Sequence, residues 1–217
     1  MGLVWTVSLS MLLSSTPETQ SRLEALLQTL GQRELEREAR TCRVLERTVV
    51  EELDGDGEVK GKVIREYTVT HDRTGPRRTL KSETFEGDPS GMFRQRPKEE
   101  KPEPSPFHPK AQALYRFELE VKPGATTGTL RFTPKKLHER RMKGTAHVDL
   151  TSSHILSMKI EPSDYPMGLD ALTMNVTLAD TACGRQPVRV TTEGEGGILF
   201  LRVRFRSDTS LSGHSST

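Results

Sequence analysis

Two histidines and an aspartate lie close together in the second half of the sequence, at His147, Asp149 and His154. Side chains of these types bind transition metals, and an aspartate beside a histidine can orient a general base. Apolar residues alternate with His147 and Asp149, which places this pair on the polar face of an expected strand. Because functional sites need side chains that converge in a cleft, we expect a solvated hairpin here, with no catalytic residue and no metal site.

The rest of the chain lacks the common signatures of enzymes and of nucleic-acid-binding proteins. It contains no glycine-rich phosphate loop before a helix, no nucleophile elbow and no Cys-x-x-Cys pair. The 32 Lys and Arg residues nearly cancel the 30 Asp and Glu residues, and aromatic residues make up only 5% of the chain. This composition therefore does not favour a basic surface with stacking aromatic side chains, which a nucleic-acid-binding protein would need. We expect a non-enzymatic protein with no cofactor and no nucleic-acid partner.

Several stretches of the second half have an apolar residue at every second position, most clearly residues 172–178 and 199–205. Successive side chains of a strand point to opposite faces, so each stretch presents one apolar and one polar face. Turn signals separate the stretches and almost no helical pattern lies between them, which favours a meandering antiparallel sheet. The predicted strands cover residues 41–53, 59–70, 77–86, 113–121, 128–133, 144–150, 155–161, 172–179, 187–192 and 198–206.

One amphipathic helix is expected before the strands, over residues 18–40, with Thr16 as its N-cap and Gly31 as a point where it could break. Its leucine stripe has to cover part of the sheet. We therefore predict a mainly β (α+β) fold. A curved antiparallel sheet forms an unclosed half-barrel, and the N-terminal helix and a loop lid cover it. The open alternative is a small closed barrel whose apolar residues pack on one another.

The two ends of the chain differ in composition from the predicted domain. Residues 3–13 form a mainly apolar run that is too short to span a bilayer and is followed by small residues and Pro17. This pattern is typical of a secretory signal peptide, which we place over residues 1–16. A single domain is expected over residues 17–207, with a frayed tail of small polar residues over 208–217. No later segment is long and apolar enough to cross a membrane.

The segment 88–109 interrupts the strand pattern with six prolines among lysines and glutamates. Proline removes backbone hydrogen-bond donors and charged side chains resist burial, so we expect a long surface excursion. Met92, Phe93 and Phe107 are its large apolar side chains. The excursion is either a mobile loop with occasional apolar contacts or a lid that these three side chains hold over a pocket.

Cys42 and Cys183 are the two cysteines of the chain. In an exported protein an even number of cysteines favours a disulfide, which here would join the first strand to a hairpin near the end of the sheet. The alternative is a pair of unrelated buried thiols.

The order of the elements resembles the LolA/LolB superfamily of periplasmic lipoprotein-carrier proteins, and more closely its uncharacterised LolA-like branch. The resemblance covers about residues 18 to 207 and includes Gly144-Thr-Ala-His-Val-Asp149, Ile155-Leu-Ser-Met-Lys159 and Glu193-Gly-Glu-Gly-Gly-Ile-Leu-Phe200. The family fold is an unclosed β-barrel lidded by helices, and its known members shelter the acyl chains of lipoproteins. The resemblance implies a periplasmic location and a role in lipoprotein transport toward the outer membrane. The proline-rich excursion departs from the family pattern, so no carrier residue is transferred.

We expect a non-enzymatic periplasmic carrier that holds a lipid or lipoprotein acyl chain in a hydrophobic half-barrel cavity. The alternative is a structural or scaffolding module of the cell envelope, with a fully packed sheet and no ligand. We expect a monomer whose partners are an acyl chain and an envelope protein. The predicted cavity residues are Val148, Leu156, Met158, Leu172, Met174, Val176, Leu199, Leu201 and Val203.

Overall fold

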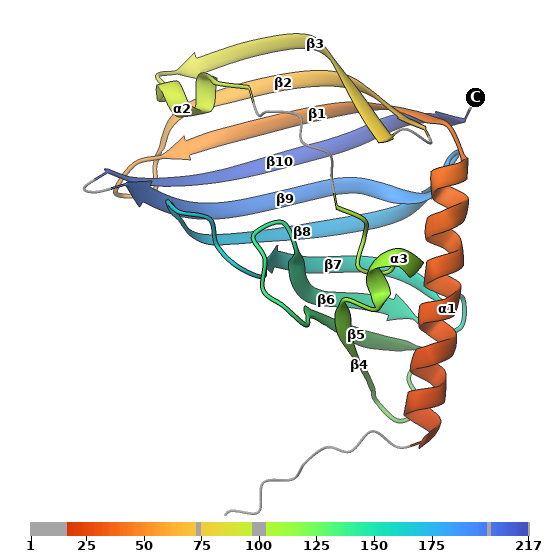
Figure 1. The fold of residues 1–217 in the computed structure, drawn as a ribbon. Helices are drawn as coiled ribbons and strands as arrows, with labels where there is room; N and C mark the ends of the chain where they lie inside the picture. Colours follow the sequence, from red (N-terminus) through yellow and green to blue (C-terminus); the bar gives the residue numbers. More distant parts are fainter. Residues whose placement is uncertain (1–16, 73–74, 97–102, 199–200, 217) are drawn as a thin grey trace, which may run out of the picture.

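The computed structural model describes residues 17–72, 75–96, 103–198 and 201–216, which form one long helix, two short helices and ten strands (Figure 1). The helices are α1 (Pro17–Ala39), α2 (Gly91–Arg94) and α3 (Pro109–Gln112). The strands are β1 (Cys42–Leu53), β2 (Val59–Asp72), β3 (Gly75–Gly87), β4 (Tyr115–Val121), β5 (Thr127–Pro134), β6 (Met142–Asp149), β7 (His154–Pro162), β8 (Leu169–Thr181), β9 (Gly184–Ile198) and β10 (Leu201–Ser216).

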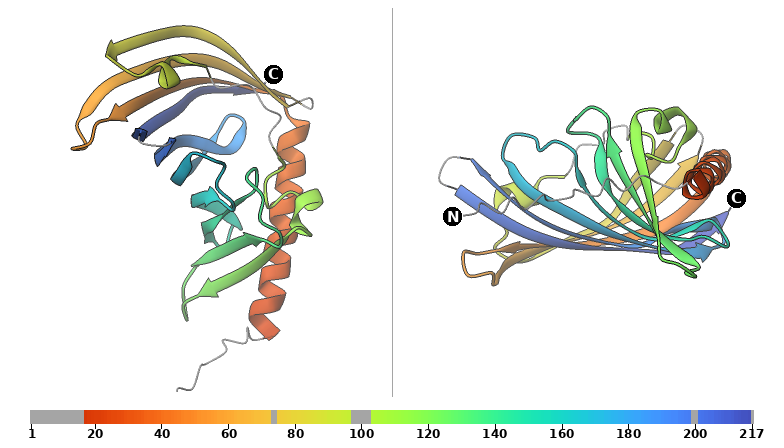
Figure 2. Two further views of the ribbon diagram at one scale, coloured as in Figure 1. Left: turned by 60° about the vertical axis from the view of Figure 1, so that its left-hand side comes forward. Right: turned by 90° about the horizontal axis from the view of Figure 1, so that it is seen from below.

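All ten strands belong to one antiparallel sheet, in the order β3-β2-β1-β10-β9-β8-β7-β6-β5-β4. The two edge strands, β3 and β4, do not pair with each other. The sheet therefore curls without closing into a barrel, as Figure 2 shows from two sides. This confirms the prediction of a mainly β fold with an unclosed sheet and an N-terminal helix.

The strand order explains why the chain needs a long excursion between β3 and β4. These consecutive strands lie at opposite edges of the sheet, so the connection has to travel from one edge to the other. Its first described part, residues 88–96, contacts β1 and β2, whereas its second described part includes α3 beside α1. Both parts lie on the same face of the sheet as α1, and we call this face the inner face.

Helix α1 covers the inner face of the half of the sheet from β4 to β7. Leu23, Leu26 and Leu30 pack in one apolar core with Leu130 and Phe132 of β5, which are almost completely buried. The strand register explains this arrangement, because residues opposite each other in neighbouring strands share a face. The other buried members of the core are Phe107, Ala111, Tyr115, Leu119, Ala146, Val148 and Ile155.

Helix α1 runs unbroken through Gly31, so the break considered at this residue does not occur. Gly31 is buried where α3 approaches the helix. A Cβ atom there would lie 3.0 Å from Nε2 of Gln112 and 3.1 Å from Cγ of Pro109. The same amide nitrogen of Gln112 donates to the carbonyl oxygens of Leu27 and Phe107, each at 2.8 Å. The glycine therefore allows α3 to be hydrogen-bonded directly to the backbone of α1.

Residues 208–216 belong to a strand, so the prediction of a frayed tail is wrong for them. Strand β10 continues to Ser216, which lies opposite Cys42 of β1. The hydroxyl groups of Thr48 and Thr209 are 2.9 Å apart across this pair of strands. Small polar residues can form a strand when a neighbour satisfies their backbone groups and hydroxyls, which composition alone does not reveal.

A disulfide joins Cys42 and Cys183, whose Cα atoms are 5.8 Å apart. It connects the start of β1 to the turn between β8 and β9, as one of the two sequence interpretations predicted. The structure therefore favours the bridge over two unrelated thiols.

The predictions for the N-terminal segment fall outside the described residues, namely the signal peptide over 1–16 and the N-cap at Thr16. Among the helices that are described, none has the length and apolar character needed to span a membrane.

Candidate ligand-binding face

From β7 to β10 the inner face carries a second row of apolar side chains, beside the fully buried core under α1. The register places Met158, Val176 and Val190 side by side on β7, β8 and β9, and it places Ile160 beside Met174. Val176 is buried, whereas the other four of these residues are half-buried, in contrast to the fully buried core under the helix. We call this surface the inner strip. It consists of Met158, Ile160, Leu172, Met174, Val176, Leu178, Val190, Val203 and Phe205.

Five of the nine predicted cavity residues lie on the inner strip, namely Met158, Leu172, Met174, Val176 and Val203. Of the other four, two are placed differently and two cannot be compared. Val148 is completely buried in the core under α1. Leu156 lies at a register irregularity between β6 and β7, where Ile155 is the residue opposite Val148. Leu199 and the side chain of Leu201 lie outside the described residues.

Phe205 closes the inner strip at β10, next to Gly194 of β9. A Cβ atom on Gly194 would lie 2.6 Å from the ring of Phe205 and 3.0 Å from Cδ1 of Leu172. The glycine therefore makes room for both side chains. The ring of Phe93 lies against Phe205, with centroids 5.9 Å apart. Phe93 comes from α2, so the excursion reaches the inner strip, as the lid interpretation predicted.

Residues 88–96, which we call the strap, are fixed to the inner face by two buried charged residues that the sequence analysis did not single out. The carboxylate of Glu52 accepts a hydrogen bond from the backbone N–H of Ser90 at 2.5 Å. The guanidinium group of Arg65 donates to the carbonyl oxygens of Phe93 at 2.8 Å, Gln95 at 3.2 Å and Arg94 at 3.3 Å. Together these contacts hold both ends of α2 on the sheet.

Arg65 is paired with Glu83 of β3 at 2.6 Å, and the side chain of Arg65 is only 7% exposed. The hydrogen bond from Arg65 is the main reason that the pKa of Glu83 lies below its usual value. The strap also packs closely at Pro89, because a Cβ atom on Gly61 would lie 2.7 Å from Cδ of this proline. The strap therefore covers part of the inner face of β1 to β3.

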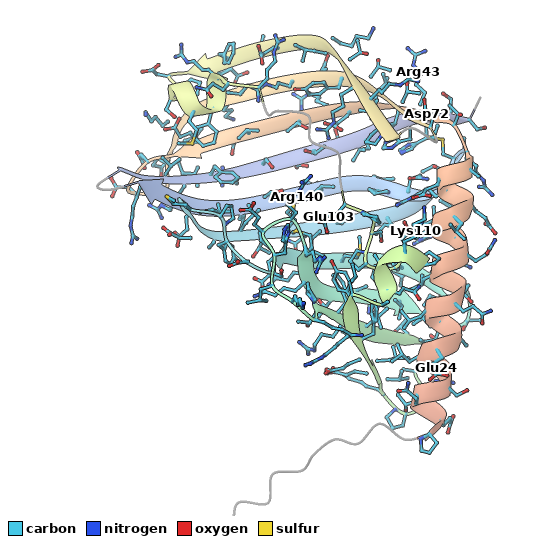
Figure 3. All side chains as sticks on the ribbon, in the orientation of Figure 1. Glu24, Arg43, Asp72, Glu103, Lys110 and Arg140 are labelled. Carbon is cyan, nitrogen blue, oxygen red and sulfur yellow. A yellow bond between two sulfur atoms is a disulfide. The ribbon has the colours of Figure 1, made fainter. Side chains whose placement is uncertain are left out.

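The three large apolar side chains of the excursion lie in different environments. Phe93 lies on the inner strip, Phe107 is buried in the core at 2% exposure, and Met92 is 62% exposed. After the strap, Glu103, which is labelled in Figure 3, forms an ion pair with Arg141 at 3.5 Å, just before β6. The described parts of the excursion are thus held against the sheet and the core by hydrogen bonds, ion pairs and ring contacts, and Met92 takes no part in the lid.

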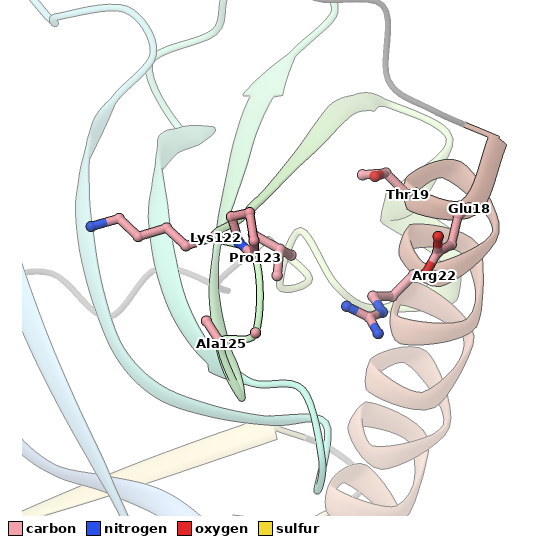
Figure 4. A pocket seen from close by; sticks show the side chains of 8 residues that line it. Glu18, Thr19, Arg22, Lys122, Pro123 and Ala125 are labelled. Atoms are coloured by element: carbon pink, nitrogen blue, oxygen red, sulfur yellow. The ribbon is translucent and has the colours of Figure 1, made fainter.

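Two pockets lie at the two ends of α1. The first, of about 500 Å³, lies between Glu18 and Arg22 of the helix and the turn at residues 122–125 (Figure 4). Polar side chains and backbone atoms make up much of its lining, and it lies at the end of the helix that is remote from the strap. The second, of about 270 Å³, lies between the C-terminal half of α1 and the ends of β7 and β8. We call the second one the rim pocket.

The His147, Asp149 and His154 group forms the solvated hairpin that the alternation predicted. His147 is exposed and lies opposite Ser157, away from the helix-covered face. Oδ1 of Asp149 accepts hydrogen bonds from the backbone N–H groups of Thr151 and Ser152, which lower the pKa of this carboxyl group. The aspartate therefore shapes the turn. Within the described ranges, no group of three or more His, Cys, Asp or Glu side chains could hold a metal ion.

His154 belongs to the rim pocket, and we expect its imidazole to titrate below its ordinary pKa of 6.5. Partial burial is the main cause, followed by the positive charges of Arg33 and Arg185. Because folding lowers this pKa, the unfolded chain protonates first, and stability is lost as the pH falls below about 6.5. Histidine NMR titrations should show a further decrease in Asp180→Asn, because Asp180 opposes the shift. An unshifted His154 would contradict this account of the pocket.

No family model and no curated protein matches the chain. Solved structures with a similar arrangement include a LolA superfamily protein from Nitrosomonas europaea, at 8% identity and a TM-score of 0.39, covering 87% of this chain and 92% of that one. Another is a putative outer membrane lipoprotein-sorting protein domain from Vibrio parahaemolyticus, at 10% identity and a TM-score of 0.38, covering 89% and 93%. A chain of the Pseudomonas aeruginosa MucA/MucB complex matches at 10% identity and a TM-score of 0.25, covering 90% of this chain and 94% of that one.

LolA superfamily structures are thus among those that the chain is similar to, as the order of its elements predicts. At these identities and TM-scores, no residue, ligand or partner is transferred from them to this protein.

Proposed function

We propose that this protein is a non-enzymatic carrier of the periplasm that holds a lipid or lipoprotein acyl chain against the inner strip. The observation that supports this most directly is the half-buried apolar surface of β7 to β10, which α1 leaves uncovered and the strap borders. Uncovered apolar surface of this kind marks a binding site more often than a structural feature.

The driving force would be the burial of methylene groups. Each methylene removed from water contributes about 0.8 kcal/mol, so a chain of a dozen would contribute about 10 kcal/mol before the cost of association. Met158 and Met174 suit this role, because the flexible and polarisable methionine side chain adapts to ligands of different shape. The strip therefore supports binding of an acyl chain without a tightly shaped cavity.

The proposed location rests on two features of the chain. The apolar run over residues 3–13 has the length of the apolar core of a signal peptide, and disulfides such as Cys42–Cys183 persist in oxidising compartments. An envelope protein as donor or acceptor of the acyl chain completes the proposal. A scaffolding module without a ligand would have the same fold and is tested by the same experiments.

Replacing Met174 with arginine should weaken uptake of a fluorescent fatty acid at least tenfold. Met174 is half-buried on the inner strip, so the new side chain can extend to water while its charge faces the acyl chain. Asn175→Arg is the matched control, because this exposed neighbour lies on the opposite face of the same strand. Circular dichroism should show the same fold in both variants. Equal uptake by both would contradict the proposed binding face.

Native mass spectrometry of protein extracted from its own envelope tests the proposal independently. We expect an added mass that matches a lipid or an acylated peptide. A bare polypeptide mass, together with no uptake of fatty acid by the wild-type protein, would favour the scaffolding module instead.

A further inference from the structure

The rim pocket and the inner strip are neighbours that share one apolar residue, Leu178. Leu30 and Ile155, which belong to the core under α1, line the pocket together with Leu178. Leu178 is also a member of the inner strip, two residues from Val176 on the same face of β8. An acyl chain on the strip could therefore place its polar end in this pocket.

Four arginines line the rim pocket, and two of them are held mainly by neutral groups. Arg33 donates to the carbonyl oxygens of Ser152, at 2.7 Å, and of Ser153. Arg185 donates to the carbonyl oxygens of Ile155 at 2.7 Å and Leu178 at 3.2 Å. Carbonyl groups fix the position of a guanidinium group without neutralising its charge. These contacts therefore build fixed positive charge into the wall of the pocket.

The carboxylates of the pocket balance this charge incompletely. Arg37 pairs with Glu34 at 2.5 Å, but burial raises the pKa of Glu34 and so disfavours its charged form. The side chain of Asp180, which pairs with Arg185 at 3.0 Å, is 72% exposed. Solvent screens the negative charge of such an exposed group. Glu36 is the remaining carboxylate, so three acids face four arginines.

Arg40 is the arginine of the pocket that is available for a ligand. Among the described residues its guanidinium group forms no hydrogen bond and no ion pair. Its Nη1 atom lies beside Gly184, where a Cβ atom would come within 3.0 Å. Arg37 and Arg40 also lie near the C-terminal end of α1, where cations offset the negative end of the helix dipole. An anion in the pocket thus meets arginine side chains instead of bare helix carbonyls.

We propose that the rim pocket binds the anionic head group, a carboxylate or a phosphate, of the amphiphile whose acyl chain lies on the inner strip. This inference rests on the proposed carrier function and adds the class of ligand to it. The head group contacts Arg40, and the fixed charges of Arg33 and Arg185 favour the anion over a neutral head group. The orientation of the ligand follows, with its polar end at the disulfide-linked turn and its chain running toward the strap.

Binding of dodecyl phosphate, dodecanoate and dodecanol, each competing with a fluorescent neutral lipid, tests this assignment. We expect the wild-type protein to bind the two anions at least fivefold more tightly than the alcohol. Arg40→Gln should reduce this ratio about threefold and Arg40→Glu about tenfold, as expected for a partly exposed charge contact. Arg116→Gln is the matched control, because Arg116 is an exposed residue of β4 outside the pocket. It should leave the ratio unchanged.

The outcomes separate this inference from the function on which it rests. If no amphiphile binds, the carrier function fails. If the alcohol binds as tightly as the anions, or if Arg40→Glu keeps the full ratio, only the head-group assignment fails, and the arginines serve the helix end alone. Binding of inorganic phosphate is the last measurement. If it binds as tightly as dodecyl phosphate, the site takes a free anion, which would overturn the assignment to a lipid.

Discussion

Replacement of both cysteines by alanine should lower the free energy of unfolding by about 3–5 kcal/mol, because the unfolded chain loses a large constraint. The bridge spans a sequence separation of 141 residues, and both Cys42 and Cys183 are buried. In the chain-entropy model this stabilisation grows with the logarithm of the loop length. Urea titrations followed by circular dichroism measure the difference. The wild-type protein in reducing buffer is the internal control and should match the double variant.

Loss of the disulfide should lower the local stability around the bridge as well as the global stability. The bridge holds the start of β1 against the turn between β8 and β9, which forms one wall of the rim pocket. Amide exchange at this turn should therefore increase more than exchange in the core around Leu130 and Phe132. If the free energy of unfolding decreased by less than about 1 kcal/mol, strand pairing alone would hold β1 in place.

Strand positions were predictable from the sequence because the alternation of apolar and polar residues is a local property. Residues 172–178 show the pattern at every position, and β8 does present these apolar side chains to the inner face. Alternation says which residues share a face, but it does not say which strand is the neighbour. The pairing of β1 with β10, which joins the first and the last strand of the chain in the middle of the sheet, is set by contacts between residues more than 150 positions apart.

The core and the open surface could not be separated from sequence for the same reason. Val148 and Val203 have the same residue type and the same alternation, yet Val148 is completely buried in the core under α1, whereas Val203 is half-buried on the inner strip. Only the position of the helix on the sheet distinguishes them. In the same way, Leu156 falls at a register irregularity that the alternation does not reveal.

The residues that hold the strap were missed although a signal for them existed. Glu52 lies two positions after Val50 on β1, and Arg65 lies two positions after Val63 on β2, so each charged residue shares a face with a valine. The pattern therefore placed both charged groups on the apolar face of their strands. A charged residue on an apolar face needs a partner, and here the partners are backbone groups of the excursion. The proline-rich composition of the excursion gave no indication that it would supply them.

Replacing Arg65 with methionine should release the strap from the sheet and lower the free energy of unfolding by about 3 kcal/mol. The substitution keeps an apolar stem of similar length but leaves Glu83, whose side chain is 16% exposed, without its buried partner. It also removes the donor to the carbonyl oxygens of the strap, so the backbone amides of residues 90–96 should exchange faster with solvent. Urea titration and hydrogen exchange with mass spectrometry measure the two effects.

A matched control for this substitution exists on the same carboxylate. Arg96 also pairs with Glu83, at 3.3 Å, but its side chain is 61% exposed, so Arg96→Gln should cost less than about 1 kcal/mol. Release of the strap in Arg65→Met should also separate Phe93 from Phe205 and expose this end of the inner strip. Uptake of a fluorescent fatty acid should then become faster in Arg65→Met and stay unchanged in Arg96→Gln. Equal uptake rates and equal exchange in the two variants would show that Arg65 stabilises the sheet without controlling access to the binding face.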